Sequence, residues 1–154
     1  MDKQALKTEL IAQLEATLAT ARIAHASAIE GSTHEEARAE NDKDTRGLEQ
    51  SYLARGQAQR VAELEAEVGD VTALALRTFT ATSVVALSAL VTIDEDGQQF
   101  LIAPAGGGCM LAGGVQVVTP SSPLGRALLG KRIDDEVKLQ LPGKLRSFAI
   151  TSIR

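Results

Sequence analysis

The sequence predicts an α+β protein, in which an N-terminal antiparallel coiled-coil helical hairpin precedes a small antiparallel sheet domain with one short helix. Two features predict this division. All four prolines fall after residue 103, and nine of the thirteen glycines fall after residue 96, so strong helix formers fill the first seventy positions. From residue 71 onward, Thr, Val, Ile and turn residues become common. We therefore expect a hairpin over residues 1–70 and a sheet domain over residues 71–154.

Apolar residues recur at intervals of three and four along both halves of the hairpin segment. In the first half they are Leu6, Leu10, Ile11, Leu14, Leu18, Ala21, Ala24 and Ala28. In the second half the pattern repeats at Leu48, Tyr52 or Leu53, the polar Gln57, Val61, Leu64 and Val68. Two antiparallel helices that pack stripe against stripe would bury these positions. The larger side chains lie at the base of the hairpin, so we expect the base to be held more firmly than the tip.

The turn of the hairpin is expected near Gly31, in a segment (residues 30–46) that contains six carboxylates. Gly31 can adopt a positive φ and end the first helix. Ser32 and Thr33 can each begin the second helix, because both are followed three residues later by Glu in a capping box. A first helix of about 28 residues would be roughly 40 Å long.

Three acids after this turn are spaced to share one helix face. Glu36, Glu40 and Asp44 follow one another at intervals of four residues. Like charges at this spacing repel by a few tenths of a kcal/mol per pair, so folding does not explain them. Two interpretations stay open at this point, a solvated helix face and an acidic surface with a function.

Short segments with strand and turn signals follow residue 71. Asp96 and Gly97 favour a hairpin turn, as does the pair Pro142-Gly143. Ser122 is a good N-cap, followed by proline at the first helical position, so a short helix is expected over residues 123–129. The expected strands are residues 84–93, 98–103, 115–118, 137–141 and 145–153.

Composition excludes several classes of function. Residues 1–70 carry 14 acids and 8 bases, and residues 71–154 carry 6 acids and 8 bases, which argues against free duplex DNA as the main ligand. Cys109 is the single cysteine, so we expect no internal disulfide and a reducing compartment. The longest apolar run, residues 84–91, is too short to cross a bilayer. We therefore expect a cytoplasmic protein that contacts no membrane.

One run in the second half resembles a known family signature. The chain reads Thr119-Pro120-Ser121-Ser122-Pro123-Leu124-Gly125-Arg126-Ala127-Leu128-Leu129-Gly130-Lys131. This run resembles the signature of the GreA/GreB transcript-cleavage factors, and Asp135-Glu136-Val137, Pro142-Gly143 and Phe148-Ala149-Ile150 fit the same family. In that family a coiled-coil hairpin precedes an FKBP-like domain. The related regulator Rnk shares much of the motif but has a much shorter coiled coil, so the long hairpin favours the GreA/GreB side.

The resemblance implies a partner and a role for each end of the protein. Family members bind bacterial RNA polymerase and insert the hairpin into its secondary channel. Tip carboxylates there help to hold a Mg²⁺ that is shared with the polymerase active centre, and the polymerase cleaves the backtracked transcript. No cofactor is then tightly bound, the chain is not itself an enzyme, and nucleic acid is contacted only through the elongation complex. The resemblance assigns polymerase docking to Ser122, Pro123, Leu124, Gly125 and Arg126.

The tip departs from the family pattern Gly-Asp-Leu-Lys-Glu-Asn, in which two acids lie three residues apart. An alignment on Gly31 puts Ser32 at the first acid. A match of residues 39–41 to Lys-Glu-Asn makes Glu40 the second acid and puts Ala37 at the first. Counting back without gaps from residues 63–65 makes Glu40 the first acid and puts Lys43 at the second.

No register restores both acids, and Glu40 is an acid in two of the three. We therefore expect Glu40 and Glu36 to act in catalysis, with Glu36, Glu40 and Asp44 as Mg²⁺ ligands only within the polymerase complex. Two alternatives stay open: a modulator or inhibitor that occupies the channel without stimulating cleavage, and an Rnk-like interaction protein of FKBP fold.

Overall fold

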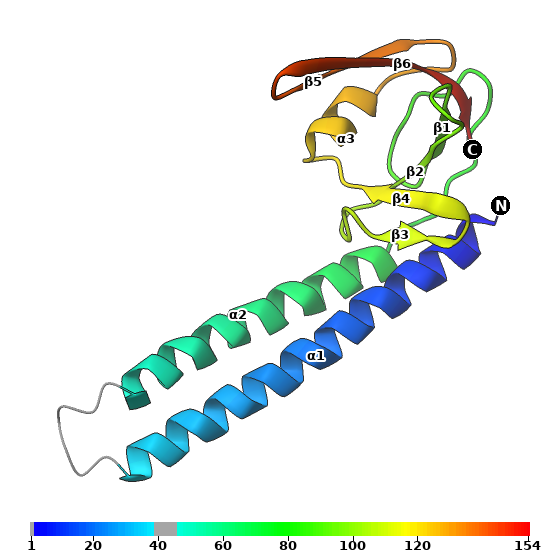
Figure 1. Cartoon of the computed structure of the whole chain (residues 1–154). Helices are drawn as coiled ribbons and strands as arrows, with labels where there is room; N and C mark the ends of the chain where they lie inside the picture. Colours follow the sequence, from blue (N-terminus) through cyan, green and yellow to red (C-terminus); the bar gives the residue numbers. More distant parts are fainter. Residues whose placement is uncertain (1, 39–45) are drawn as a thin grey trace. The chain divides into compact units, whose positions relative to one another are not determined.

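The computed structural model describes residues 2–38 and 46–154 (Figure 1). The chain forms two compact units, one of Ala12–Val68 and one of Met1–Ile11 together with Gly69–Arg154. The first is a helix pair, and the second contains a mixed sheet with a short helix, so the predicted α+β class is confirmed. The predicted boundary after residue 70 keeps the first helix in the hairpin, whereas the compact units divide that helix after Ile11.

Two long helices form the hairpin: α1 (Lys3–Arg38) and α2 (Arg46–Thr72). The prediction that Gly31 ends the first helix is wrong, because α1 continues through Gly31 and through the proposed caps Ser32 and Thr33. One glycine inside a helix costs only about 1 kcal/mol, and the following Glu-Glu-Ala-Arg run has high helix propensity. At 36 residues, α1 is roughly 54 Å long.

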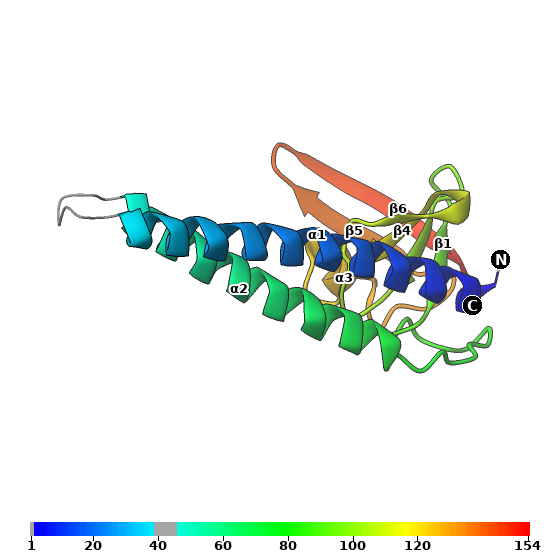
Figure 2. The same cartoon turned by 90° about the horizontal axis from the view of Figure 1, so that it is seen from below.

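Within Ala12–Val68, the two helices run side by side in opposite directions (Figures 1 and 2). Leu18, Ala21 and Leu64 are buried against one another, and Val61 and Val68 pack on this cluster. These positions are the predicted apolar stripes of the two helices.

The predicted seam is wrong toward the start of α2. Leu48, Tyr52 and Leu53 are 56%, 60% and 49% exposed. The half-buried residues here are Ser51, Ala54 and Gln57. These positions continue the three- and four-residue spacing of Val61, Leu64 and Val68, so register along the helix, rather than side-chain size, decides which residues face α1.

Six strands form the sheet in the order β3-β4-β2-β1-β6-β5. The strands are β1 (Leu90–Ile93), β2 (Gln99–Ile102), β3 (Met110–Leu111), β4 (Val115–Val118), β5 (Glu136–Leu141) and β6 (Lys144–Ile153). A short 3₁₀ turn (Ala112–Gly114) precedes β4, and the helix α3 (Pro123–Leu128) follows it. The predicted turns at Gly97 and Gly143 are confirmed, and both glycines have positive φ, at 64° and 76°.

Three details of the sheet differ from the prediction. β2 and β4 are parallel, whereas the expected sheet was antiparallel throughout, and β3 was not anticipated. The strand expected over residues 84–93 begins only at Leu90. Ser88 interrupts it with φ of 72°, and its buried hydroxyl accepts a hydrogen bond from the backbone N–H of Arg77 at 2.9 Å.

The start of α1 packs on the sheet unit and belongs to it. Leu6 and Leu10 are fully buried, and a Leu10 methyl carbon lies 2.7 Å from where a Cβ on Gly106 would be. Lys7 donates to the Leu74 carbonyl at 2.8 Å, and Glu9 accepts from the Ala112 N–H at 2.9 Å. These bonds join residues far apart in the chain, so the first turns of α1 are anchored by polar as well as apolar contacts.

Candidate functional site

The α3 loop (residues 119–126) consists of the loop before α3 and the first turn of that helix, and it is held by the side chain of Ser122. Its hydroxyl accepts a hydrogen bond from the Gly125 N–H at 3.0 Å and donates one to the Thr119 carbonyl at 2.8 Å. Pro123 occupies the first helical position, where its missing N–H removes no helical hydrogen bond. The predicted N-cap and first-position proline are therefore confirmed, and the Ser122 hydroxyl ties the loop to the helix through two hydrogen bonds.

Position 125 requires glycine, because the backbone of the same loop lies against it. A Cβ at this buried position would overlap the Thr119 carbonyl oxygen and lie 2.8 Å from the carbonyl carbon. Backbone atoms cannot move aside as the end of a flexible side chain can. Only glycine therefore allows the loop to fold directly onto the first turn of α3.

Arg126 supports the loop from the outside. Its Nε and Nη2 donate to the Ser121 carbonyl at 3.0 and 2.8 Å, although the side chain is exposed. A guanidinium has five N–H groups, so three remain for solvent or a partner. Arg126 thus presents positive charge from a fixed position at the surface.

A mainly apolar groove of about 410 Å³ lies beside this loop. Pro123 and Leu124 line it from α3, and Leu139 and Leu141 line it from β5. The remaining lining residues are Gly107, Gly108, Gln116, Val117, Val118, Thr119 and Ser122. The sequence motif ends at residue 131, so it did not indicate the leucines of β5. Their alternating spacing was the available signal, since it places both on one face of a strand.

The predicted acidic site cannot be compared with the fold in the same way. Glu36 lies within α1, but its side chain is outside the described structure, as are Glu40 and Asp44 entirely. Their common face and their roles in catalysis and Mg²⁺ binding stay predictions. Among the residues that are described, no group of three or more His, Cys, Asp or Glu side chains is arranged to hold a metal ion.

No helix in the described parts of the chain has the length and apolar character needed to span a bilayer.

Solved structures that match this chain include GreA factor homolog 1 (Gfh1) of Thermus thermophilus, with 22% sequence identity and a TM-score of 0.39. That alignment covers 97% of this chain and 95% of the other. Gfh1 of Thermus aquaticus matches at 24% identity with a TM-score of 0.41, over 98% and 95% of the two chains. The transcription elongation factor GreA/GreB from Nitrosomonas europaea matches at 17% identity and a TM-score of 0.37, over 80% and 91%.

One sequence comparison matches the half that carries the α3 loop, and another extends over most of the chain. Residues 111–154 match the family model described as "Transcription elongation factor, GreA/GreB, C-term". Transcription elongation factor GreA of Syntrophus aciditrophicus is 47% identical over 36 residues, which are 23% of this chain and 22% of that protein. GreA of Zymomonas mobilis is 29% identical over 126 residues, 77% of this chain and 76% of that protein. Residues 111–154 therefore match the C-terminal region of the GreA/GreB family, and 126 residues of this chain are similar to a GreA transcription elongation factor.

Proposed function

We propose that this protein is an elongation factor that binds RNA polymerase through the α3 loop and its groove, and brings its acidic segment (residues 30–46) into the secondary channel to stimulate cleavage of backtracked transcripts. The observation that carries this proposal is the family match over residues 111–154, which includes the whole α3 loop. In this proposal the chain is not itself an enzyme, and the polymerase makes the cut. Such a role places the protein in the cytoplasm, with nucleic acid contacted only through the elongation complex.

The α3 loop has the properties of a docking surface. Pro123 is exposed and Leu124 half-buried at the edge of the apolar groove, and Arg126 adds a positive charge nearby. Because Ser122 and Gly125 hold the loop in one conformation, little conformational entropy is lost when a partner binds. An apolar groove with a charged rim is a common composition for a protein–protein contact.

The acidic segment supplies the chemistry in this proposal. Glu40 and Glu36 act at the reacting phosphodiester, and Asp44 joins them as a ligand of Mg²⁺ shared with the polymerase. Carboxylate oxygens are the donors that Mg²⁺ prefers, so the residue types fit the ion. When bound, the ion supplies Lewis acidity for phosphodiester hydrolysis. The residues of this chain contribute negative charge and oxygen donors at the end of a long hairpin.

A second candidate function is favoured by the departures at the tip. Ser32 or Ala37 stands where the family has its first acid, and Lys43 takes the second position in the remaining register. A factor without the acid pair would occupy the channel and modulate or inhibit the polymerase instead.

A cleavage assay on a stalled, backtracked complex separates these two functions. Shortened transcripts that appear only with the factor and Mg²⁺ support cleavage. Slower elongation without shortening, at every Mg²⁺ concentration, supports the modulator. Affinity capture with the full chain from a bacterial lysate tests docking itself. A capture that recovers no core polymerase subunits contradicts both functions and favours an Rnk-like interaction protein.

A further inference from the structure

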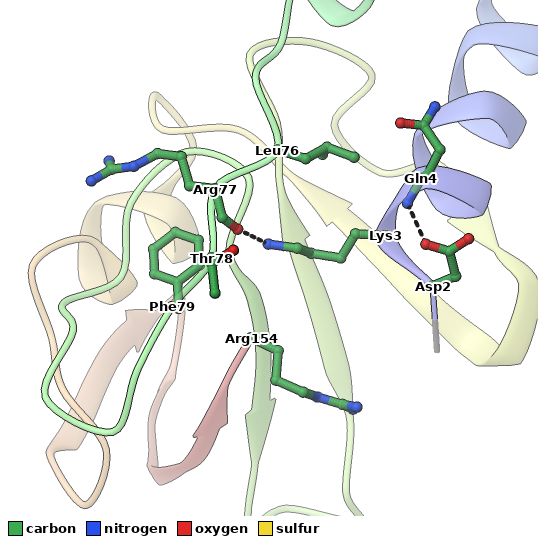
Figure 3. A pocket seen from close by; sticks show the side chains of 8 residues that line it. All are labelled: Asp2, Lys3, Gln4, Leu76, Arg77, Thr78, Phe79 and Arg154. Atoms are coloured by element: carbon green, nitrogen blue, oxygen red, sulfur yellow. Dashed lines mark hydrogen bonds between the residues drawn. The ribbon is translucent and has the colours of Figure 1, made fainter.

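A second pocket, of about 420 Å³, lies beside the first turn of α1 and within the sheet-containing unit (Figure 3). It is formed by the start of α1, by the segment that follows α2, and by the residue after β6. The lining residues are Asp2, Lys3, Gln4, Leu76, Arg77, Thr78, Phe79 and Arg154. None of them belongs to the α3 loop or to the acidic segment, so the proposed function does not use this pocket.

Lys3 reaches from α1 into the middle of the pocket (Figure 3). Its ammonium donates hydrogen bonds to the carbonyls of Arg77 and Ser88, and lies 4.8 Å from the centre of the Phe79 ring. An ammonium has three N–H donors, so one remains after these two bonds. The neutral carbonyls and the ring position Lys3, but they do not cancel its charge.

Two guanidinium groups add to this positive charge. The guanidinium of Arg77 lies 5.7 Å from the centre of the same Phe79 ring. Within residues 2–38 and 46–154, Lys3, Arg77 and Arg154 make no ion pair, and the Arg154 side chain makes no hydrogen bond. Asp2 is the single acidic side chain of the lining, and its carboxylate already accepts from the Gln4 N–H at 3.0 Å. The lining thus carries three cationic side chains and one acidic side chain, although the chain as a whole has a net charge of −4.

The ammonium of Lys3 is partly buried and has no carboxylate partner among residues 2–38 and 46–154. Burial lowers the pKa of the Lys3 ammonium, and no carboxylate offsets this effect in the described structure. An anion bound beside Lys3 would favour its charged form and raise this pKa again.

We propose that this pocket binds the phosphate groups of a small polyphosphate-bearing ligand. Arg154 supplies a planar fork of N–H donors, Lys3 its remaining donor and Thr78 a hydroxyl, which together suit tetrahedral anions with several oxygens. The Phe79 ring is already engaged with two cations, Lys3 and Arg77. Recognition therefore rests on the phosphates, whether they come from free polyphosphate or from a nucleotide.

The test is an NMR titration of the full chain with sodium tripolyphosphate, ATP and adenosine, with ionic strength kept constant by NaCl. We expect tripolyphosphate and ATP to shift the amide signals of Lys3, Thr78 and Arg154 with similar affinity, whereas adenosine leaves them unchanged. Shifts with adenosine, or shifts spread over the surface without concentration at this pocket, would overturn the proposal.

Arg154→Gln is the decisive variant, because the Arg154 side chain makes no hydrogen bond that the fold needs. Loss of one charged donor should weaken tripolyphosphate binding about tenfold. Lys144→Gln is the matched control, since it removes one exposed cation at the start of β6, outside the pocket lining. Equal affinity of the wild type and Arg154→Gln, with both proteins folded as judged by their melting temperatures, would also overturn the proposal.

Discussion

Gly125 lies so close to Thr119 that a single added methyl group would overlap the Thr119 carbonyl oxygen. Gly125→Ala should therefore lower the free energy of unfolding by about 3 kcal/mol, because backbone must shift and the Ser122 cap must open. Urea denaturation measures this loss. Gly56→Ala is the control, since nothing lies within 4 Å of a Cβ at Gly56 in α2. It should stabilise the protein by about 0.5–1 kcal/mol. Similar stability of the two variants would contradict the close approach.

The hydroxyl of Ser122 makes two hydrogen bonds at the start of α3. Ser122→Ala should lower the free energy of unfolding by about 1 kcal/mol, the usual cost of a lost N-cap. Ser121→Ala, at the neighbouring position, is the control. It keeps the backbone carbonyl of Ser121, to which Arg126 donates its hydrogen bonds. Thermal melting of both variants makes the comparison. A larger loss for Ser121→Ala than for Ser122→Ala would show that the cap is not what holds the loop.

The surface beside the α3 groove can be tested by reversing one charge. Arg126→Glu should weaken polymerase binding about tenfold, which corresponds to about 1.4 kcal/mol. The lost bonds to Ser121 should lower stability by no more than about 1 kcal/mol, as is usual at the surface. Lys138→Glu makes the same change on the face of β5 opposite Leu139, away from the groove. If both variants bind equally well in surface plasmon resonance, the docking surface lies elsewhere.

A substitution of Glu40 tests the mechanism proposed for the acidic segment. Glu40→Ala should leave polymerase binding nearly intact and reduce transcript cleavage at least tenfold, because a lost ligand acts on the transition state at about 1.4 kcal/mol per tenfold of rate. Cleavage assays at saturating factor measure the change, with Glu30→Ala as a control at the edge of the same segment. Glu36→Ala and Asp44→Ala, added singly to Glu40→Ala, identify the acid that shares the ion. Undiminished cleavage by Glu40→Ala would assign catalysis to another acid of the segment.

Lys3 should make stability depend on alkaline pH. Burial lowers its pKa below the ordinary 10.5, so the charged form opposes folding at neutral pH. As the pH rises through the folded-state pKa toward 10.5, the unfolded chain holds more protons than the folded one, and stability contributed by this site increases. The other charged side chains that line the same pocket are Arg77, Arg154 and Asp2. The stability of the wild type relative to Lys3→Met should therefore rise as the pH approaches 10.5 from below. A constant difference would contradict the effect.

Local chemistry predicted those parts of the fold that depend on a few neighbouring residues. The cap at Ser122, the proline after it and the turn at Gly143 each depend on side chains within three positions. The end of α1 did not follow the local rule, because the helix propensity of the residues after Gly31 outweighs the cost of one glycine.

The groove and the parallel pairing of β2 with β4 could not be predicted from local sequence, since each brings together residues that are not neighbours in the chain. In the same way, Tyr52 and Leu53 were predicted to face α1 but are exposed, and Ser51 and Ala54 are half-buried instead. Apolar character alone does not determine which side of a helix faces its neighbour. Lys3 and Arg154 lie at opposite ends of the sequence, so no motif could place them in one pocket.

The pairing of β1 with β6 has a consequence for protein synthesis. Val91 lies opposite Ile153, so one edge of β1 has no neighbour until about sixty further residues have been made. At 5–20 residues per second, a ribosome needs roughly 3–12 s for that stretch. During this time β1 and its apolar neighbours expose an open edge, to which another nascent chain can add. The helix pair depends only on contacts within residues 12–68, so it can form before β6 has been synthesised and the sheet is complete.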